Sequence, residues 1–496
     1  MDKYSPSAVD PVSSVPKNSS ETLLVDKKLE RNAIRKLDFT IVPVMILFYV
    51  LSFLERVNIG NARVAGLQKD LHLTDKQYQI CLTVLFIPYI LTELPATLAL
   101  RKIGPRVMIP TLLAVWGLLP PFKLEGFINS FQGLLAARFF LGFVEGPVTP
   151  SILLYLSGFY TRQELSTRMA YFFATSGLTA AFAGLLAAAI EDMNGLGGKA
   201  GWRWILILEG LLSFVVGVGG YFLMPSDLRD SGILTEDEKD LLERRLEQDR
   251  PSISDELSLE PVIQALMSPH VIIMFVVGFL LGTVIFGLAL FMGSIVNELG
   301  FTPTRSQLLG AGPFGAGFFT AFTASYVSDK YMIRGIPSAI GAIISAVGFA
   351  VFLRARDKFV VYGSLYLTVP GIYATLPVMV SWIANNSEPH YRRASCIGLV
   401  VMSVNMGGIL STWSFPTKDA PRFTKTTIMN LVFCVVMALC LLANSLILSW
   451  MNASKQRRRA EILAPYGGDD SDGKMRGGEL AWKELGDKHP DFRYTT

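Results

Sequence analysis

The sequence has little charge for its length. Only 17% of its 496 residues are Asp, Glu, Lys or Arg, whereas 51% are apolar, and the mean hydropathy is +0.41. This balance excludes an ordinary soluble globular protein. The formal net charge of +4 is small, and the basic residues gather in short connections between apolar runs. We therefore expect a protein whose partner is the lipid bilayer, with no nucleic-acid partner.

Cysteine and histidine are also scarce, with four of each. The cysteines fall in apolar runs at spacings that match no metal site, and the histidines fall in loops, at segment ends or in the tail. There is no nucleophile cluster and no stretch like a selectivity filter, and Gly195 to Lys199 lacks the spacing and the Ser or Thr of a phosphate loop. We expect no enzyme, ATP-driven pump or channel, and no cofactor or metal.

Long apolar segments make up most of the chain. Most of them exceed the ~20 residues that span the hydrocarbon core of a bilayer. They predict an all-α polytopic membrane protein with twelve transmembrane helices in two pseudo-symmetric six-helix bundles. The expected helices are 39–62, 77–100, 107–123, 130–154, 168–190, 203–224, 271–295, 306–328, 336–353, 359–384, 394–416 and 426–450.

The basic residues predict the topology. They cluster before the first apolar segment, in alternate connections and after the last segment, so both termini are expected in the cytosol. In the longest connection, Thr235 to Glu238 has the pattern of a helix capping box, and Leu241, Leu242 and Leu246 form one apolar stripe. The expected division is a cytosolic tail at 1–37, a bundle at 38–224, a cytosolic linker with a short helix at 225–269, a second bundle at 270–450 and a cytosolic tail at 451–496.

Two charged residues interrupt the apolar stretch from Ile128 to Tyr160. Arg138 and Glu145 are seven residues apart, so on a helix they share one face, and Gly142 and Gly146 lie on the same face. A charge near the bilayer centre costs at least ~2.5–3.5 kcal/mol, and such residues usually mark transport pathways. A polar cavity is therefore favoured, and a buried ion pair that only holds helices together is the alternative.

Several motifs occur in a recognisable order. Phe53 to Ala62 reads FLERVNIGNA, and it is followed by Phe86-Ile87-Pro88-Tyr89, Glu93-Leu94-Pro95, Arg138 to Gly146, Gly201-Trp202-Arg203-Trp204, Asn405-Met406-Gly407-Gly408 and Asp487 to Tyr494. Charged turns follow the second and eighth segments. This pattern resembles the major facilitator superfamily, and within it the fungal anion:cation symporters, the group of allantoate, nicotinate and pantothenate permeases. The resemblance covers nearly the whole chain.

The resemblance implies a central cavity that contains Glu55 and Arg56. The sequence alone also allows an interfacial position for them, because they follow a sixteen-residue uncharged run. Arginine offers planar donors and a permanent charge for a carboxylate, so Arg56 is the first candidate for substrate binding and Arg138 the second. Glu145 and Glu55 are the candidates for proton coupling, since a buried carboxyl can exchange a proton at physiological pH.

Further site residues follow from the same motifs. Tyr89, Asn58 and Asn405 are expected to contact substrate, although Tyr89 is equally compatible with aromatic packing between helices. Gating or structural roles are expected for Glu93, Arg101, Arg106, Asp329, Arg334 and Glu209.

Two features depart from the family pattern, and one feature of the drug antiporters is missing. The family's aspartate in the first helix is Glu55 here, and the loop after the second helix has Leu100 where the superfamily usually has an aspartate. The proline motif of drug:proton antiporters is absent around Ser176 to Ala180. The missing motif favours uptake over efflux. Together with the family resemblance, we expect proton-coupled uptake of a small organic anion such as nicotinate, pantothenate or allantoate, by a monomer in the plasma membrane. An exporter of a secondary metabolite and a non-transporting nutrient sensor remain the alternatives.

Overall fold

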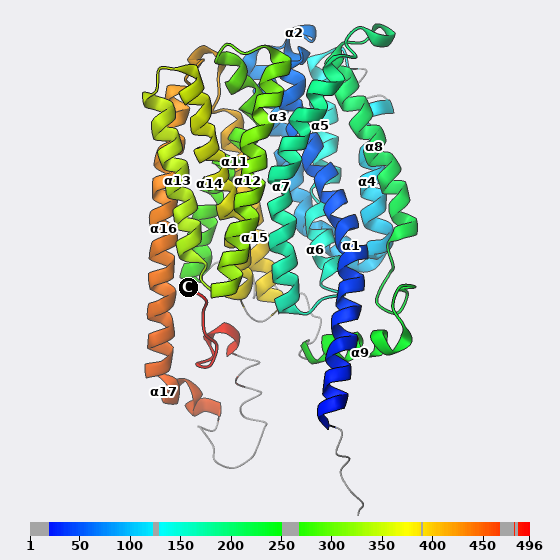
Figure 1. Ribbon diagram of the computed structural model, residues 1–496, viewed down its shortest axis with the longest axis vertical. Coiled ribbons are helices and arrows are strands. Elements are labelled where there is room, and N and C mark those ends of the chain that lie inside the picture. The colour runs from blue at the N-terminus through cyan, green and yellow to red at the C-terminus, as the bar shows by residue number, and fades with distance from the viewer. Residues whose placement is uncertain (1–18, 123–127, 250–266, 388–389, 467–480, 482–484) are drawn as a thin grey trace, which may run out of the picture.

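The computed structural model is helical throughout the part it describes, which comprises residues 19–122, 128–249, 267–387, 390–466, 481 and 485–496 (Figure 1). Long helices stand side by side, and one group of them comes from each half of the sequence. The first half contains α1 (Ser19–Val64), α2 (Leu67–Asp70), α3 (Asp75–Ile103), α4 (Pro105–Phe122), α5 (Phe131–Glu145), α6 (Val148–Leu156), α7 (Arg162–Glu191) and α8 (Gly201–Leu223).

The second half repeats this plan after the linker helix α9 (Glu236–Asp249). It contains α11 (Pro269–Glu298), α12 (Pro303–Tyr331), α13 (Gly335–Arg354), α14 (Lys358–Asn385), α15 (His390–Thr412) and α16 (Thr424–Arg457), followed by the short α17 (Arg459–Leu463). Nine helical spans in the described residues are long and apolar enough to cross a membrane. The helices α3, α4 and α12 pack against them and complete the predicted twelve.

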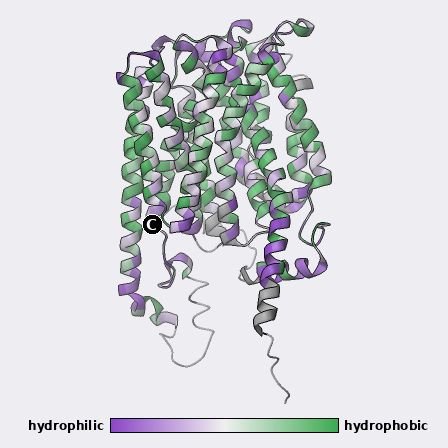
Figure 2. Ribbon diagram, viewed as in Figure 1, coloured by the Kyte–Doolittle hydropathy of each residue, from purple (hydrophilic) through white to green (hydrophobic). Residues whose placement is uncertain are grey.

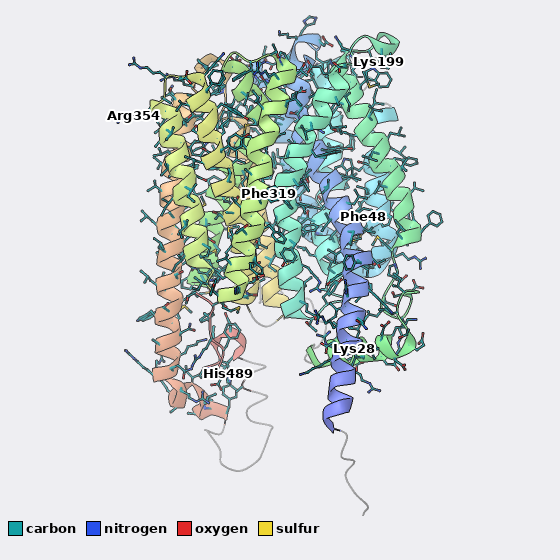
Figure 3. The ribbon with its side chains drawn as sticks, in the orientation of Figure 1. Lys28, Phe48, Lys199, Phe319, Arg354 and His489 are labelled. Carbon is teal, nitrogen blue, oxygen red and sulfur yellow. The ribbon has the colours of Figure 1, made fainter. Side chains whose placement is uncertain are left out.

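The two ends of the bundle differ. Apolar residues form a band across the middle of the molecule, and hydrophilic residues lie at both ends (Figure 2). Lys199 and Arg354 lie at the end that carries α2, which we call the loop end (Figure 3). Lys28 and His489 lie at the opposite end with α9, which we call the tail end (Figure 3).

Most predicted helices match the structure to within a few residues, with two informative differences. The first helix begins at Ser19, twenty residues before the predicted start at 39, because the Glu- and Lys-rich segment ahead of the apolar run continues the helix. The predicted helix 130–154 is divided into α5 and α6 at Gly146 and Pro147. Proline has no backbone N–H to donate, which accounts for the interruption.

Glycines in α5 allow a close approach of α3. A Cβ at Gly142 would overlap the Leu85 carbonyl oxygen, and one at Gly146 would lie 2.5 Å from the Tyr89 carbonyl oxygen. The motif around Gly142 and Gly146 therefore brings two helices together, as small residues do in membrane proteins. This contact fixes the position of Glu145 relative to α3.

The two halves touch each other at the loop end. A Cβ at Gly60 of α1 would overlap the Leu290 carbonyl oxygen of α11. The Thr83 and Thr412 hydroxyls lie 2.7 Å apart, and Arg63 Nη2 donates to Thr417 Oγ1 at 3.0 Å. The halves also meet along α7 and α12, where the Tyr171 and Phe322 rings stack. The contacts of Gly60, Thr83 and Arg63 close the bundle at the loop end, whereas the Tyr171–Phe322 contact lies farther towards the tail end.

Ion pairs attach the linker to the first half. The predicted capping box is present, because Thr235 N donates to Glu238 and Glu238 N donates to Thr235 Oγ1. Lys36 Nζ lies 2.7 Å from Glu238, and Arg245 lies 3.0 Å from Glu30 and 3.0 Å from Glu164. Burial by itself would raise the pKa of Glu164, but the hydrogen bond and charge of Arg245 hold that pKa below its ordinary value.

Amide side chains attach the C-terminal segment to the second half. Asn452 Nδ2 donates to the Tyr494 carbonyl and Asn452 Oδ1 accepts from Tyr494 N, both at 2.9 Å. Asn386 holds Thr495 in the same two-point manner at 2.9 and 2.8 Å, and Trp382 Nε1 donates to the Thr495 carbonyl at 2.7 Å. This amide clamp, formed by Trp382, Asn386 and Asn452, joins the tail ends of α14 and α16.

Candidate functional site

The centre of the candidate site is an ion pair between Arg56 and Glu145. Arg56 Nε lies 2.8 Å from Glu145 Oε1, and Arg56 Nη2 bonds the same oxygen. The side chains are 8% and 0% exposed. The other oxygen, Glu145 Oε2, has no hydrogen-bond partner among the described residues. The pair thus leaves one carboxylate oxygen available to a proton.

Aromatic rings from both halves surround the guanidinium of Arg56. Its carbon lies 4.5 Å from the Tyr89 ring centre, 6.0 Å from that of Phe86 and 5.4 Å from that of Phe286. Phe286 belongs to α11, so Arg56 faces the second half. Such contacts favour a cation over the ring faces.

Glu55 points in a different direction from Arg56, as neighbouring residues on a helix must. Trp116 Nε1 of α4 donates to Glu55 Oε2, and Ser213 Oγ of α8 donates to Glu55 Oε1 at 3.4 Å. Glu55 therefore lies inside the first half, apart from the Arg56–Glu145 pair. No feature of the sequence pointed to Trp116 as its partner.

Asn58 lies beside Glu209. Asn58 Nδ2 donates to Glu209 Oε1, and Asn61 Nδ2 donates to Asn58 Oδ1 at 2.7 Å. Asn58 and Glu209 are 0% and 1% exposed, respectively. The contact joins α1 to α8, which agrees with a structural interpretation of Glu209.

The remaining predicted site residues lie around this centre. Arg138 is 1% exposed and acts electrostatically on both Glu145 and Tyr78. Tyr89 Oη lies 3.5 Å from Thr149 Oγ1, so its ring faces Arg56 while its hydroxyl approaches α6. Asn405 of α15 is 3% exposed and donates to the Val401 carbonyl of its own helix at 3.1 Å.

The charged turns lie at the tail end. Arg106 lies 2.7 Å from Asp230, which joins α4 to the linker, and both side chains are 44% exposed. Arg334 pairs with Asp329 and donates to Ser328 Oγ at 3.0 Å. The side chain of Arg101 lies outside the described residues. In the described part of the chain, no group of three or more His, Cys, Asp or Glu side chains is arranged to hold a metal.

The structure has two bundles of membrane helices, and a buried ion pair of the first bundle faces the second. This arrangement is that of a polytopic transporter. The chain belongs to the Major Facilitator Superfamily, whose sequence profile matches residues 45–412.

Known proteins similar to this chain are transporters too. An uncharacterised transporter of Schizosaccharomyces pombe is 34% identical over 90% of this chain and 90% of its own length. The high-affinity nicotinic acid transporter of Saccharomyces cerevisiae is 29% identical over 94% of this chain and 85% of its own length. Both agree with the predicted membership of the fungal anion:cation symporter family. A bacterial homologue of the human lysosomal transporter Spinster, solved inward-facing and unoccupied, has the same fold, with a TM-score of 0.64, 14% identity and coverage of 82% and 96% of the two chains.

Proposed function

We propose that this transporter takes up a small organic anion together with a proton. The observation that carries the proposal is the buried Arg56–Glu145 pair, which faces the second half of the protein. Arginine is suited to a carboxylate because its planar donors can form two parallel hydrogen bonds. A substrate carboxylate is therefore a competitor of Glu145 for the same guanidinium.

This competition couples anion to proton. When the substrate binds Arg56, Glu145 loses its cation, and an unpaired buried carboxylate is unfavourable. Glu145 then binds a proton, for which Oε2 is available. Each ligand thereby favours the other's binding, and by linkage the effect is reciprocal. The two ligands leave together when the halves rock about the site.

The rings around Arg56 favour a flat substrate. Phe86, Tyr89 and Phe286 lie within 6.0 Å of the guanidinium carbon. A planar aromatic acid would place its carboxylate on Arg56 and its ring against these side chains. The name of the nicotinic acid transporter among the relatives supports the same substrate class. We therefore place nicotinate first among the candidate anions.

Transport assays in vesicles test the proposal. Purified protein is placed in lipid vesicles, and the uptake of labelled nicotinate, pantothenate and allantoate is measured with an inward proton gradient, with and without a protonophore. Accumulation that the protonophore abolishes is the expected result. If labelled anion accumulated only when the proton gradient was directed outward, the protein would be an exporter. No counterflow of any anion would indicate a sensor and contradict the proposal.

The proposed topology places both termini and the linker in the cytosol of a plasma-membrane protein that works as a monomer. The chain then divides at the boundaries predicted above, with α9 lying beneath the first bundle. A cysteine replacing exposed Glu247 should resist an impermeant thiol reagent in intact cells, whereas one replacing exposed Asp192 at the loop end should react. If only Glu247→Cys reacted, the orientation in the membrane would be the opposite of the one proposed.

A further inference from the structure

Glu93 is a buried carboxyl that the proposed coupling does not use. It lies in α3, is 7% exposed, and its Oε2 has no hydrogen-bond partner among the described residues. The sequence suggested a gating or structural role, but a structural carboxylate would be expected to accept hydrogen bonds. Glu93 is one helical turn from Tyr89, on the tail-end side.

Among the described residues, one cation acts electrostatically on Glu93. Arg56 of α1 exerts an attractive electrostatic effect on Glu93, but Arg56 is hydrogen-bonded to Glu145. The described part of α15, which also packs on α3, contains no charged side chain between Ser395 and Thr412. The other described titratable or charged groups on the helices packed against α3 are Glu145 and Arg138 of α5, Tyr155 of α6, Arg106 of α4 and Cys396 of α15. On α3 itself they are Asp75, Lys76, Tyr78, Cys81, Tyr89 and Lys102. The side chains of Arg101 and of residues 390–394 are not described.

A carboxylate in this position is unfavourable while Arg56 is engaged elsewhere. Burying an ion without a partner is costly, and the usual outcome in proteins is that the group takes up a proton. Glu145 differs, because its own cation compensates its charge. Tyr89 contacts Arg56 at the centre of the site, and Glu93 lies one helical turn farther towards the tail end.

We propose that Glu93 is a second proton-binding site, on the tail side of the Arg56–Glu145 pair. It holds a proton in the conformation described here, with the loop end closed. It gives this proton up when Arg56 turns from Glu145 towards it: the O–H bond of Glu93 breaks, the proton passes to water at the tail end, and the carboxylate pairs with the guanidinium. The contribution of this site to transport rests on the function proposed above.

Infrared spectroscopy tests the proton directly and needs no substrate. The full-length protein in lipid vesicles at neutral pH should show the carbonyl band of a protonated carboxyl, and this band should be missing in Glu93→Gln. Glu93→Asp should restore a band. Glu209→Gln is the matched control, since it alters a buried carboxyl hydrogen-bonded by Asn58 and should leave the Glu93 band in place. Identical carbonyl regions in wild type and Glu93→Gln would overturn the proposal.

Counting protons tests the role in transport. In vesicles, the pH gradient that just balances a gradient of labelled nicotinate gives the number of protons per anion. Glu93→Gln should lower that number by one, which lowers the greatest accumulation about tenfold for each pH unit of gradient. Glu93→Asp should retain the wild-type number. A purely structural role would change the rate or the amount of protein, and an unchanged number would contradict the proposal.

The two measurements separate the two proposals. If wild-type vesicles move no organic anion, the proposed function fails, while the infrared comparison still decides whether Glu93 holds a proton. If anions move and the band of Glu93 is absent, the proposed function stands and the second proton site is wrong.

Discussion

The two halves of this transporter share a fold but differ in their buried chemistry. The interior of the first half holds the ionisable side chains Glu55, Arg56, Glu93, Arg138, Glu145 and Glu209. In the second half, the buried Arg, Lys, Asp and His residues of the described chain all lie at the tail end, and they are His270, Arg334, Lys455, Asp487 and His489. Elsewhere its membrane helices bury mainly hydroxyls and amides. In the mechanism proposed above, the first half would therefore bind the anion and exchange the proton, and the second half would move against it.

The peripheral segments repeat this difference. Ion pairs from Glu238 and Arg245 hold the linker under the first half, whereas the amide clamp of Trp382, Asn386 and Asn452 holds the C-terminal segment under the second. Ion pairs weaken with acid and salt, and neutral amides do not. The two halves should therefore respond differently to the same perturbation.

The largest effect on transport is expected from changes at Arg56, the proposed anion-binding residue of the first half. Arg56→Lys keeps the charge but loses the planar donors, and the lost charge-assisted hydrogen bonds are worth about 1.5–3 kcal/mol. Arg56→Gln also leaves Glu145 unpaired, at a cost of about 3–5 kcal/mol. We expect uptake of labelled nicotinate to fall at least about tenfold with Lys and about a hundredfold with Gln.

The matched control for Arg56 is Arg354→Lys, at an exposed position of the loop end. It should transport normally, and surface labelling should show all three variants in the membrane. Near-normal uptake by both Arg56 variants would move the anion site elsewhere, with Arg138 next in order.

The second effect concerns the driving force. Glu145→Gln imitates the protonated acid, so it should bind substrate and exchange it, yet lose accumulation driven by a proton gradient. The loss is about tenfold for each pH unit of gradient per proton. Glu55→Gln serves as the comparison, because Glu55 is turned towards Trp116 and Ser213 and away from the ion pair. If Glu145→Gln concentrates nicotinate normally, Glu55 becomes the leading candidate for that proton.

The third effect concerns the contact between the halves. Gly60→Ala would overlap the Leu290 carbonyl oxygen and force the halves apart at the loop end. Overpacking of this kind costs about 1–3 kcal/mol, so we expect transport several-fold slower and a cysteine placed near the loop end to react faster. Gly219→Ala meets nothing within 4 Å and should behave as wild type. Equal rates in the two variants would show that this contact does not limit the cycle.

The fourth effect is on the neutral attachment in the second half. The double change Asn386→Ala with Asn452→Ala removes both two-point contacts to Tyr494 and Thr495. At about 1 kcal/mol for each hydrogen bond lost, it should lower thermal stability and expose the C-terminal segment to proteolysis at every pH. Ser449→Ala, which removes a hydroxyl that donates to the Ser445 carbonyl of its own helix, should change neither. Unchanged protection of the segment would mean that the clamp does not hold it.

The smallest effect is on the charged attachment in the first half. Glu164 precedes the apolar part of α7, and its folded-state pKa is below the ordinary value. A carboxyl of this kind contributes stability at neutral pH that is lost as the pH falls through the lowered pKa. Proteolysis of the linker by an acid-active protease should therefore increase on acidification. Arg245→Ala, at a cost of about 1 kcal/mol or less, should flatten this dependence. A wild-type linker equally protected at all pH values would contradict this interpretation.

Most of the helices could be predicted from the sequence, whereas only part of the candidate site could. Apolar length and turn residues gave the twelve helices and the capping box at Thr235. The buried charges were evident because charged side chains are rare in apolar runs. Their partners were not evident: Glu145 pairs with Arg56, 89 residues away, although Arg138 shares its own helix. Trp116 and Phe286 contact the site from other helices, and nothing local in their sequence distinguishes them from packing residues.

The sequence by itself determined which segments lie in the membrane, which ionisable groups are buried and which family the chain resembles, because hydropathy and motif order act along the chain. Only the tertiary structure decided which carboxyl each cation meets, that Glu55 turns away from Arg56, and that Glu93 has an oxygen without a partner among the described residues. These outcomes depend on the rotation and depth of packed helices. A close approach such as that of α5 at Gly142 to α3 at Leu85 fixes that rotation and depth, and spacing along one helix cannot specify them.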